Sequence, residues 1–596
     1  MLLFLCAAQG ILPAGDIVAE AKNTVSWWCE TVFREVIARK KASCHPCEEE
    51  GQCEKQKEYL EENMKRRRWL AFCLIVSFLF ILAGCSKSTD KSAAAAKDSV
   101  IISMDSESEP AAGFDPIMGW AAGEHTHDPL IQSTLLITKD DITIGYDLAK
   151  EYTISPDGLT WTFKIRPDVK FTDGVPLTAK DVAFTYNNAM KQATDTDLSM
   201  LKSAEAIDDT TVVFHMNTPY SAFAYTAAVV GIVPEHAYKA ETYGKNPIGS
   251  GRYILKQWDK GQQVILEANP DYYGEKPNIK KVTIVFMSED ASYAAAKGGQ
   301  VDVAYTAPSY TVNPVKGYNI LSFNTEDIRG LNLPSIPAGN KTPAKRNGET
   351  YPAGNNVTAN LAIRQAIACA VDREAIVKNV LNGYGSVAYS DCVNEPWENE
   401  AMKVAYDPAK AKAILEADGW KLNAEGIYEK QGLKAEFDLL YMSSNSARTG
   451  IAMAVKEMLQ QVGIRVNPVG ASWDKIATLC YETPHVFGAG SHSPTGIRSH
   501  YYTGKNYASY SNPTVDSHIE EALAATSVEA SYQFWKKAQW DGSAGVTPQA
   551  DSPWVWLVEV KHIYFAKENL NVIDKKIHPH GYGWTIVNNV HQWSWK

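Results

Sequence analysis

Cysteine is scarce in most of this chain. Of the ten cysteines among its 596 residues, only Cys369, Cys392 and Cys480 lie beyond residue 85. This low density excludes the dense disulfide framework of small secreted domains. One disulfide among the three remains open, because the sequence does not say which of them lie close together.

Positive charge and reaction motifs are also sparse. The formal net charge is −11, and no long basic stretch follows Ser86. This balance disfavours nucleic-acid binding. The chain contains no Gly-x-Ser-x-Gly elbow, no His-Glu-x-x-His pair and no P-loop. The sequence therefore predicts a protein that is not an enzyme.

The apolar run Trp69–Leu82 is too short to cross a bilayer as a helix. It has 14 residues, against about 20 for a membrane-spanning helix. Four basic residues precede it, and Ala83-Gly84-Cys85 follows it. This order is typical of a secretory signal. The Cys after Leu-Ala-Gly resembles the lipobox of bacterial lipoproteins, which implies a signal peptide over 64–84 and acylation of Cys85; a stop-transfer anchor is the alternative.

Residues 1–63 precede this signal, which belongs at an N-terminus. They contain five of the ten cysteines, Cys6, Cys29, Cys44, Cys47 and Cys53. We interpret them as an upstream extension from a misplaced start, with Met64 as the real first residue. A zinc site around Cys44-His45-Pro46-Cys47 is the alternative, although its spacing is irregular. Residues 85–98 read as a flexible tether, rich in Ser, Ala and Lys.

The rest of the chain alternates between strand and helix patterns. Strands are predicted at 100–103, 160–165, 211–216, 281–286, 301–305 and 464–466, and helices at 288–297, 360–381, 407–417 and 447–462. A further helix starts after Thr178, which has Asp181 three residues on, as in a capping box. Mixed elements of this kind predict α/β lobes.

Three sequence blocks resemble the family 5 extracytoplasmic solute-binding proteins of peptide and nickel ABC transporters. The first, at 148–182, contains SPDGLTWTF and DVKFTDGVPLTAKDV. The second is NPIGSGRY at 246–253, with NPDYYG at 269–274. The third is LAIRQAI at 361–367, with VDR at 371–373. We interpret these blocks as scaffold, since their Gly, Pro and Asp residues suit turns and close bends.

The resemblance implies a bilobal periplasmic-binding-protein-like α/β fold with an extra inserted lobe and a central ligand cleft. It places a discontinuous lobe I at 99–128, 245–325 and 556–596, lobe II at 129–244 and lobe III at 326–555. Ligand would bind between the lobes, and their closure would present it to a permease.

The ligand should be read from the cleft. In peptide-binding relatives, a Trp-x-x-Asp-like segment offers an acid to the ammonium group of the peptide. The corresponding stretch here, 486–494, has Ser491 and His492 in that place. A neutral imidazole supplies no negative charge, but it can ligate nickel. We therefore predict Ser491 and His492 as ligand contacts and His492 as a tentative metal ligand; a plain loop histidine is the alternative.

Two further contacts are predicted beside the cleft. Arg329 lies where the family's chain crosses into lobe III, and its guanidinium could hold a carboxylate or pair with a nearby acid. Trp120 could stack on a flat ligand, while His125 and His127 read as loop histidines. The C-terminus of this family returns to lobe I, so we interpret the tryptophans at 593 and 595 as packing; a metal site at the histidines 578 and 580 is the alternative.

The expected function is that of a lipid-anchored substrate-binding protein of an ABC importer. Its partners would be the permease subunits and their separate ATPase, and it would work as a monomer on the outer side of the cell membrane. The ligand would be a nickel chelate or a short peptide, with nickel bound only as part of the transported ligand and no cofactor. A ligand-sensing receptor that feeds a membrane signalling partner is the alternative.

Overall fold

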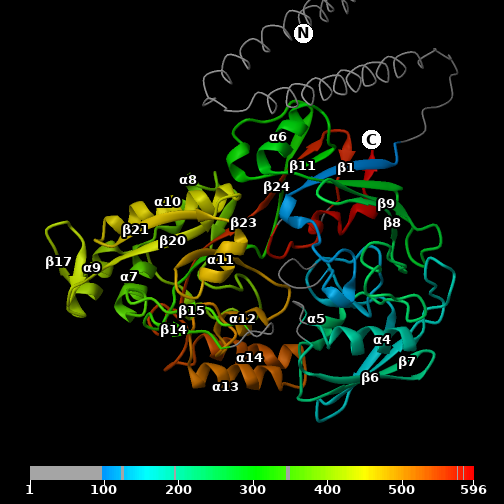
Figure 1. The fold of residues 1–596 in the computed structure, drawn as a ribbon, viewed down its shortest axis with the longest axis horizontal. Helices are drawn as coiled ribbons and strands as arrows, with labels where there is room; N and C mark the ends of the chain where they lie inside the picture. The colour runs from blue at the N-terminus through cyan, green and yellow to red at the C-terminus, as the bar shows by residue number, and fades with distance from the viewer. Residues whose placement is uncertain are drawn as a thin grey trace, which may run out of the picture. The chain divides into compact units, whose positions relative to one another are not determined.

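Three β-sheets of seven, six and four strands carry the fold (Figure 1). The structure is a computed structural model that describes residues 97–121, 127–192, 196, 198–343, 349–573, 575–581 and 583–596. The predicted signal segment, Cys85, the cysteine-rich start and His125 lie outside the described residues. Within the described residues, Cys369, Cys392 and Cys480 are buried, and none of the three forms a disulfide.

The seven-stranded sheet draws its strands from three distant parts of the chain. In spatial order they are β12 (Tyr318–Phe323), β24 (His562–Lys567), β11 (Val303–Thr306), β1 (Ser99–Met104), β10 (Lys281–Phe286), β9 (Gln263–Ala268) and β8 (Tyr253–Asp259). β1 pairs in parallel with both β10 and β11. Trp595 Nε1 donates to the Ser99 carbonyl at 2.9 Å, so the C-terminus lies beside β1, as Figure 1 shows.

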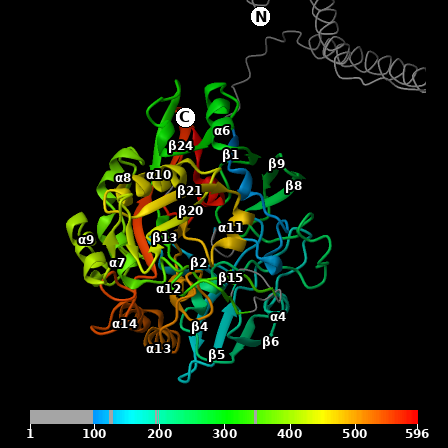
Figure 2. The same cartoon turned by 60° about the vertical axis from the view of Figure 1, so that its left-hand side comes forward.

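The six-stranded sheet follows the seven-stranded one along the chain. Its order is β16 (Gly385–Val387), β23 (Trp554–Val560), β13 (Ile328–Asn332), β22 (His485–Ala489), β20 (Glu436–Met442) and β21 (Arg465–Ala471). Figure 2 shows β20 and β21 side by side, and β22 lies between β20 and β13 in the sheet. β23 belongs to this sheet over its whole length, so the predicted lobe limit at residue 556 falls inside a strand. The other lobe limits stay predictions.

The four-stranded sheet lies within residues 149–216. Its order is β4 (Ala149–Ile154), β5 (Thr160–Ile165), β7 (Thr211–Met216) and β6 (Leu201–Asp208). The remaining described strands are short. They form three pairs, β2 (Leu136–Thr138) with β3 (Ile144–Tyr146), β14 (Asn340–Lys341) with β15 (Pro352–Ala353) and β25 (Leu570–Asn571) with β26 (Ser594–Trp595), and one three-stranded sheet of β17 (Lys421–Leu422), β18 (Tyr428–Lys430) and β19 (Leu433–Lys434).

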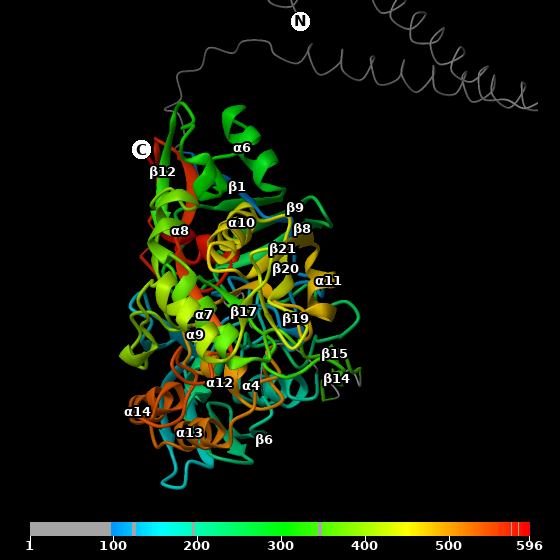
Figure 3. The same cartoon turned by 90° about the vertical axis from the view of Figure 1, so that its left-hand side faces the viewer.

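Most of the described helices begin at a side-chain cap. The helices are α4 (Ala179–Ala189), α5 (Phe223–Ala227), α6 (Glu289–Lys297), α7 (Leu361–Ala370), α8 (Arg373–Asn379), α9 (Pro408–Ala417), α10 (Ser446–Gln460), α11 (Trp473–Leu479), α12 (Gly496–Tyr501), α13 (Pro513–Leu523) and α14 (Val528–Gln539). Of these described helices, α5, α11 and α12 have no such cap. Thr178 and Asp181 form the predicted capping box of α4. α7 and α9 pack together, as do α13 and α14 (Figure 3).

One predicted helix is two helices. The pattern at 360–381 indicates a continuous helix, but Val371 is extended, at φ −91° and ψ 117°, and separates α7 from α8. Asp372 then caps α8 by accepting from the Ala375 amide at 2.9 Å. Arg373 Nε donates to the Trp556 carbonyl at 2.8 Å. The break therefore directs a buried cation at the six-stranded sheet, which periodicity alone does not reveal.

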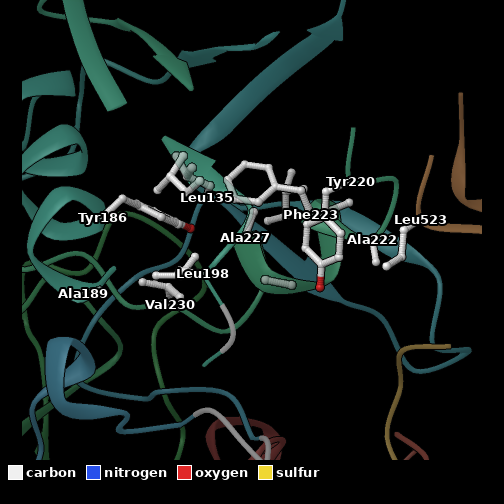
Figure 4. Packing of buried hydrophobic residues seen from close by; sticks show 14 of the residues in the cluster. Leu135, Tyr186, Ala189, Leu198, Tyr220, Ala222, Phe223, Ala227, Val230 and Leu523 are labelled. Atoms are coloured by element: carbon white, nitrogen blue, oxygen red, sulfur yellow. The ribbon is translucent and has the colours of Figure 1, made fainter. Parts of the chain in front are cut away.

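The described hydrophobic residues form several buried clusters, one of which joins the four-stranded sheet to part of the six-stranded sheet. Figure 4 shows part of one core, where Tyr186 of α4 and Phe223 of α5 point into the same space, their ring centroids 6.0 Å apart. The same cluster continues to Leu523 of α13. The Ser221 hydroxyl donates to the Ala522 carbonyl at 3.0 Å. The region of the four-stranded sheet is thus joined to α13, far along the chain.

Two segments of the chain link the seven- and six-stranded sheets. Residues 324–327 link β12 to β13, and Lys561 links β23 to β24. Thr325 forms a bridge with His578, and its hydroxyl donates to the Val560 carbonyl at 2.8 Å. Several polar side chains described below lie on this crossing.

Candidate ligand-binding cleft

Three adjoining cavities lie along the crossing segments. We name them after one residue of each: the Arg329 cavity of about 530 Å³, the His492 cavity of about 300 Å³ and the Glu326 cavity of about 910 Å³. His580 lines the first two, and Tyr225 lines the last two. The three spaces therefore form one irregular cleft between elements of all three large sheets.

Arg329 faces its cavity from β13 but already has an acidic partner. The side chain is 1% exposed, and its Nη2 donates to Asp327 Oδ2 at 2.8 Å, with Nη1 bonded to the other oxygen. Residues i and i+2 on a strand share a face, so the bidentate pair follows from local geometry. The Nε of Arg329 is buried and has no hydrogen-bond partner among the described residues.

Asp327 anchors a buried cationic cluster. It accepts from His562 Nε2 at 2.9 Å and from His580 Nδ1 at 2.5 Å, besides its two bonds from Arg329. Burial by itself raises the pKa of Asp327, but the charges of Arg329 and His580 outweigh it and lower the pKa well below its usual value. Asp327 thus stays ionised at the centre of the crossing.

Trp120 forms part of the wall of the Arg329 cavity. It is 6% exposed and packs edge-on against Phe114, Trp584 and His127, with ring centroids 4.8, 5.0 and 4.4 Å away. Its indole Nε1 donates to the Pro129 carbonyl at 3.4 Å. Most of the ring is therefore engaged in the aromatic core, and the remaining edge borders the cavity.

His492 and Ser491 line the neighbouring cavity from the segment after β22. His492 Nε2 lies 2.8 Å from the Ile577 carbonyl. Because a carbonyl only accepts, Nε2 carries the proton, and in the neutral ring Nδ1 keeps a lone pair. Burial lowers the pKa of His492 to about 3, helped by Lys576, so the imidazole is neutral. Ser491 Oγ accepts from the Ser493 amide at 3.2 Å, which leaves its hydroxyl proton to donate elsewhere.

Gly490 lets this segment pass the crossing. Its φ is +147°, and a Cβ there would overlap the Glu326 carbonyl oxygen. Only a residue without a side chain fits such an approach. Gly249 and Gly251 are needed for a similar reason, since a Cβ on either would overlap the backbone of residues 130–131.

The structure brings the predicted residues into neighbouring cavities. Arg329 and Trp120 share one cavity, Ser491 and His492 share the next, and His580 connects the two. Glu326 and Asp327 are the acids that the sequence reasoning did not single out. Their signal was present in Glu326-Asp327-x-Arg329, where an i, i+2 acid–base pair stands at a strand start.

Comparison with known proteins identifies the family. Residues 143–507 match the model of the bacterial extracellular solute-binding proteins, family 5 middle region. The chain belongs to this family. It is therefore an extracytoplasmic solute-binding protein of the ABC-importer class, whose partners are a permease and an ATPase, and it is not an enzyme. Family members carry no cofactor; nickel is a transported ligand in some of them.

Relatives of this solute-binding protein include peptide and nickel binders. It is 29% identical over 491 residues to Protein XP55 of Streptomyces lividans, covering 79% of this chain and 85% of that one. It is 30% identical over 450 residues to the oligopeptide-binding protein AppA of Bacillus subtilis, covering 69% and 78%. The structure of NikZ from Campylobacter jejuni with Ni(L-His) superposes with a TM-score of 0.72 at 24% identity, covering 84% and 99%. The last similarity establishes the bilobal α/β fold with its ligand cleft.

In the part of the solute-binding protein that the structure describes, none of the helices combines the length and the apolar character needed to cross a bilayer.

Proposed function

We propose that this solute-binding protein is a lipid-anchored receptor that captures a nickel chelate and delivers it to its permease. Acylation of Cys85 would provide the anchor, and residues 86–98 the tether to the folded part. The observation that carries the choice of ligand is the protonation state of His492.

His492 offers a metal a neutral nitrogen in a small cavity. Its Nε2–H is held by the Ile577 carbonyl, and a hydrogen bond of this kind fixes the orientation of a metal-binding histidine ring. Nδ1 is then the nitrogen that ligates nickel, a metal that imidazole suits. Among the described residues no group of three or more metal-binding side chains occurs. A chelator, such as free histidine or a small organic acid, would supply the other ligands.

The neighbouring polar groups suit a chelator. The Ser491 hydroxyl can donate to a carboxylate, and so can Arg329 Nε, which the Asp327 pair leaves unused. Because Asp327 neutralises most of the guanidinium charge, we expect Arg329 to orient a carboxylate more than to attract it. Trp120 would limit the Arg329 cavity on one side.

A short peptide is the second candidate, and the volume of the cleft favours it. The Arg329 and Glu326 cavities, at about 530 and 910 Å³, exceed the need of a single metal chelate. AppA of Bacillus subtilis, the relative at 30% identity, is named an oligopeptide-binding protein.

Isothermal titration tests the two ligands against each other. The purified protein, refolded to remove bound ligand, would be titrated with Ni²⁺ plus excess histidine, with Ni²⁺ alone and with a pool of di- to pentapeptides. We expect nickel–histidine to bind, and His492→Ala to weaken it by about 100-fold. His215→Ala on β7, with a side chain 41% exposed, is the matched control. Heat from peptides alone, unchanged in His492→Ala, would overturn the nickel assignment and leave the peptide candidate.

A further inference from the structure

The Glu326 cavity has a strong excess of negative charge. Its lining includes five carboxylate side chains and one cation, Lys561. The acids are Asp141, Glu326, Glu395, Glu529 and Glu559. The exposed acids at its rim are screened by water, so the buried ones decide what the cavity accepts.

Glu326 is the most deeply placed of these acids. It is 6% exposed, and neither of its carboxylate oxygens has a hydrogen-bond donor among the described residues. Glu395 lines the same cavity, and its charge acts on Glu326; Glu395 Oε2 is also buried without a donor among the described residues. Two ionised carboxylates cannot satisfy each other, because neither carries a hydrogen to donate.

The groups that face Glu326 do not neutralise it. His492 Nε2 lies 3.9 Å from Glu326 Oε2, but its proton is directed at the Ile577 carbonyl and the ring is neutral. Glu559 adds a further negative charge, and it accepts from the Ser386 hydroxyl at 2.7 Å. The positive charge of Lys561 acts on Glu559, where it lowers the pKa and partly offsets the effect of burial. The pair Glu326–Glu395 thus lacks a counter-charge of its own.

Aromatic rings form the walls beside the two carboxylates. Tyr225 and Tyr532 are hydrogen-bonded to each other, and Tyr532 packs on Trp397 with ring centroids 5.3 Å apart. Tyr152 stacks on Trp161 at 5.4 Å, and all five rings line the cavity. Aromatic faces attract cations and exclude water from them.

We propose that the Glu326 cavity binds an organic cation, a primary ammonium or a guanidinium group, between Glu326 and Glu395. This inference rests on the proposed solute-binding function and adds a chemical class to its ligands. The source of the cation is a basic side chain of a bound peptide or a free alkylamine. The cavity volume of about 910 Å³ lies within the range of small-molecule sites.

The donor geometry favours an organic cation over a metal ion. An ammonium group has three donors and a guanidinium group five, so each can bond two facing carboxylates at once. A hard metal ion would require six or more oxygens, and no group of three or more suitable side chains occurs in the described residues.

Binding should displace a proton from Glu326. Burial raises the pKa of Glu326 well above its usual value, and Glu395 and Glu559 raise it further. The bound cation takes the place of this proton, which passes to the buffer. Titration heats should therefore depend on the ionisation enthalpy of the buffer, with about one proton released.

The test compares charged and uncharged probes of the same shape. The purified, refolded protein would be titrated with pentapeptides of alanine that carry lysine, arginine or norleucine at each position in turn, and with 1,5-diaminopentane. Glu326→Gln and Glu395→Gln remove the charge with little change of shape. Glu267→Gln on β9, an exposed acid paired with Lys256 at 3.6 Å, is the matched control.

We expect a lysine or arginine peptide, or the diamine, to bind about tenfold or more tightly than its norleucine or uncharged counterpart. The preference should vanish in both cavity variants and persist in Glu267→Gln. The affinity for norleucine peptides should stay within about twofold in all of these variants. A response to peptides alone identifies the side chain as the source, and a response to the diamine identifies a free amine.

Equal binding of lysine and norleucine peptides by the unmodified protein, with no binding of the diamine, would overturn this inference and leave the proposed function standing. Absence of binding of every peptide, of the diamine and of nickel–histidine would overturn both. A preference that survives in both folded cavity variants would place the cation elsewhere and also contradict the inference.

Discussion

Glu326 and Glu395 bring two carboxyl groups together at a point that little water reaches. Burial raises the pKa of both, and the negative charge of each neighbour adds to the effect on Glu326. A carboxyl with a raised pKa holds its proton better in the folded than in the unfolded chain. Its contribution to stability is therefore present below the unfolded pKa of 4.5 and is lost as the pH rises through the folded value.

The first prediction is that Glu326→Gln makes the protein more stable at pH 8. Each unit by which the folded pKa is raised costs about 1.4 kcal/mol once the carboxyl is ionised, and glutamine removes that cost. At pH 4 the two proteins should differ little. Urea unfolding at both pH values checks this, with Glu267→Gln as control. An unfolding free energy of Glu326→Gln at pH 8 no higher than that of Glu267→Gln would contradict the prediction.

The second prediction concerns His485, a fully buried residue of β22. Burial lowers its pKa to about 3, and its Nε2 has no hydrogen-bond partner among the described residues. A lowered histidine pKa means that the unfolded chain binds the proton better. The stability from the neutral ring is complete above pH 6.5 and falls as the pH drops below it.

His485→Gln should therefore flatten the loss of stability between pH 6.5 and 4. The unmodified protein loses up to about 1.4 kcal/mol per pH unit from this group in that range. Unfolding free energies in urea across the range measure the slope. His215→Gln, at an exposed site on β7, should keep the slope of the unmodified protein; an unchanged slope in His485→Gln would refute the assignment.

At the scale of elements, the end of β22 determines how the crossing and the cleft meet. The strand stops at Ala489, and Gly490 turns the chain past the Glu326 carbonyl before Ser491 and His492 enter their cavity. A side chain at residue 490 would push the strand end away from the crossing and carry the two cleft residues with it.

The third prediction is that Gly490→Ala destabilises the protein by about 3 kcal/mol or more, because overlap and an unfavourable backbone angle act together. The added methyl group has no room to move away from a backbone oxygen. Thermal or urea unfolding measures the loss. Gly496→Ala at the start of α12, where a Cβ meets nothing within 4 Å, is the control, and a loss as small as in that control would disprove the argument.

At the scale of the whole molecule, the segment at 64–85 is the proposed determinant of location. It resembles a lipoprotein signal, and it lies outside the described residues. If the proposal holds, export depends on residues from Met64 onward, and membrane attachment depends on the Cys85 thiol.

The fourth prediction is that deletion of residues 1–63 leaves export and ligand binding unchanged, whereas Cys85→Ser moves the protein from the membrane to the soluble fraction. Loss of this one acyl-cysteine is expected to be sufficient because Cys85 is the proposed attachment to the membrane. Fractionation and mass spectrometry of the mature N-terminus measure both effects. Membrane retention of Cys85→Ser would favour the stop-transfer alternative.

Most single elements followed from local sequence, because their causes are local. The cap at Thr178 and the strands at 160–165 and 211–216 needed only neighbouring residues, and the structure places them as predicted. The exception at Val371 has a tertiary cause, since the break lets Arg373 reach backbone carbonyls of a distant strand. A helical period does not register such a contact.

By itself the sequence determined the family, the α/β class, the absence of catalytic motifs and the candidates Arg329 and His492, because motif order and residue chemistry are written along the chain. The tertiary structure alone decided which groups meet. It showed that Asp327 occupies most of the Arg329 guanidinium, that the Ile577 carbonyl sets the protonation of His492, and that Glu326 faces Glu395. These partners lie up to 85 residues apart in the case of His492 and Ile577. Burial, which sets their charges, exists only once the chain has folded.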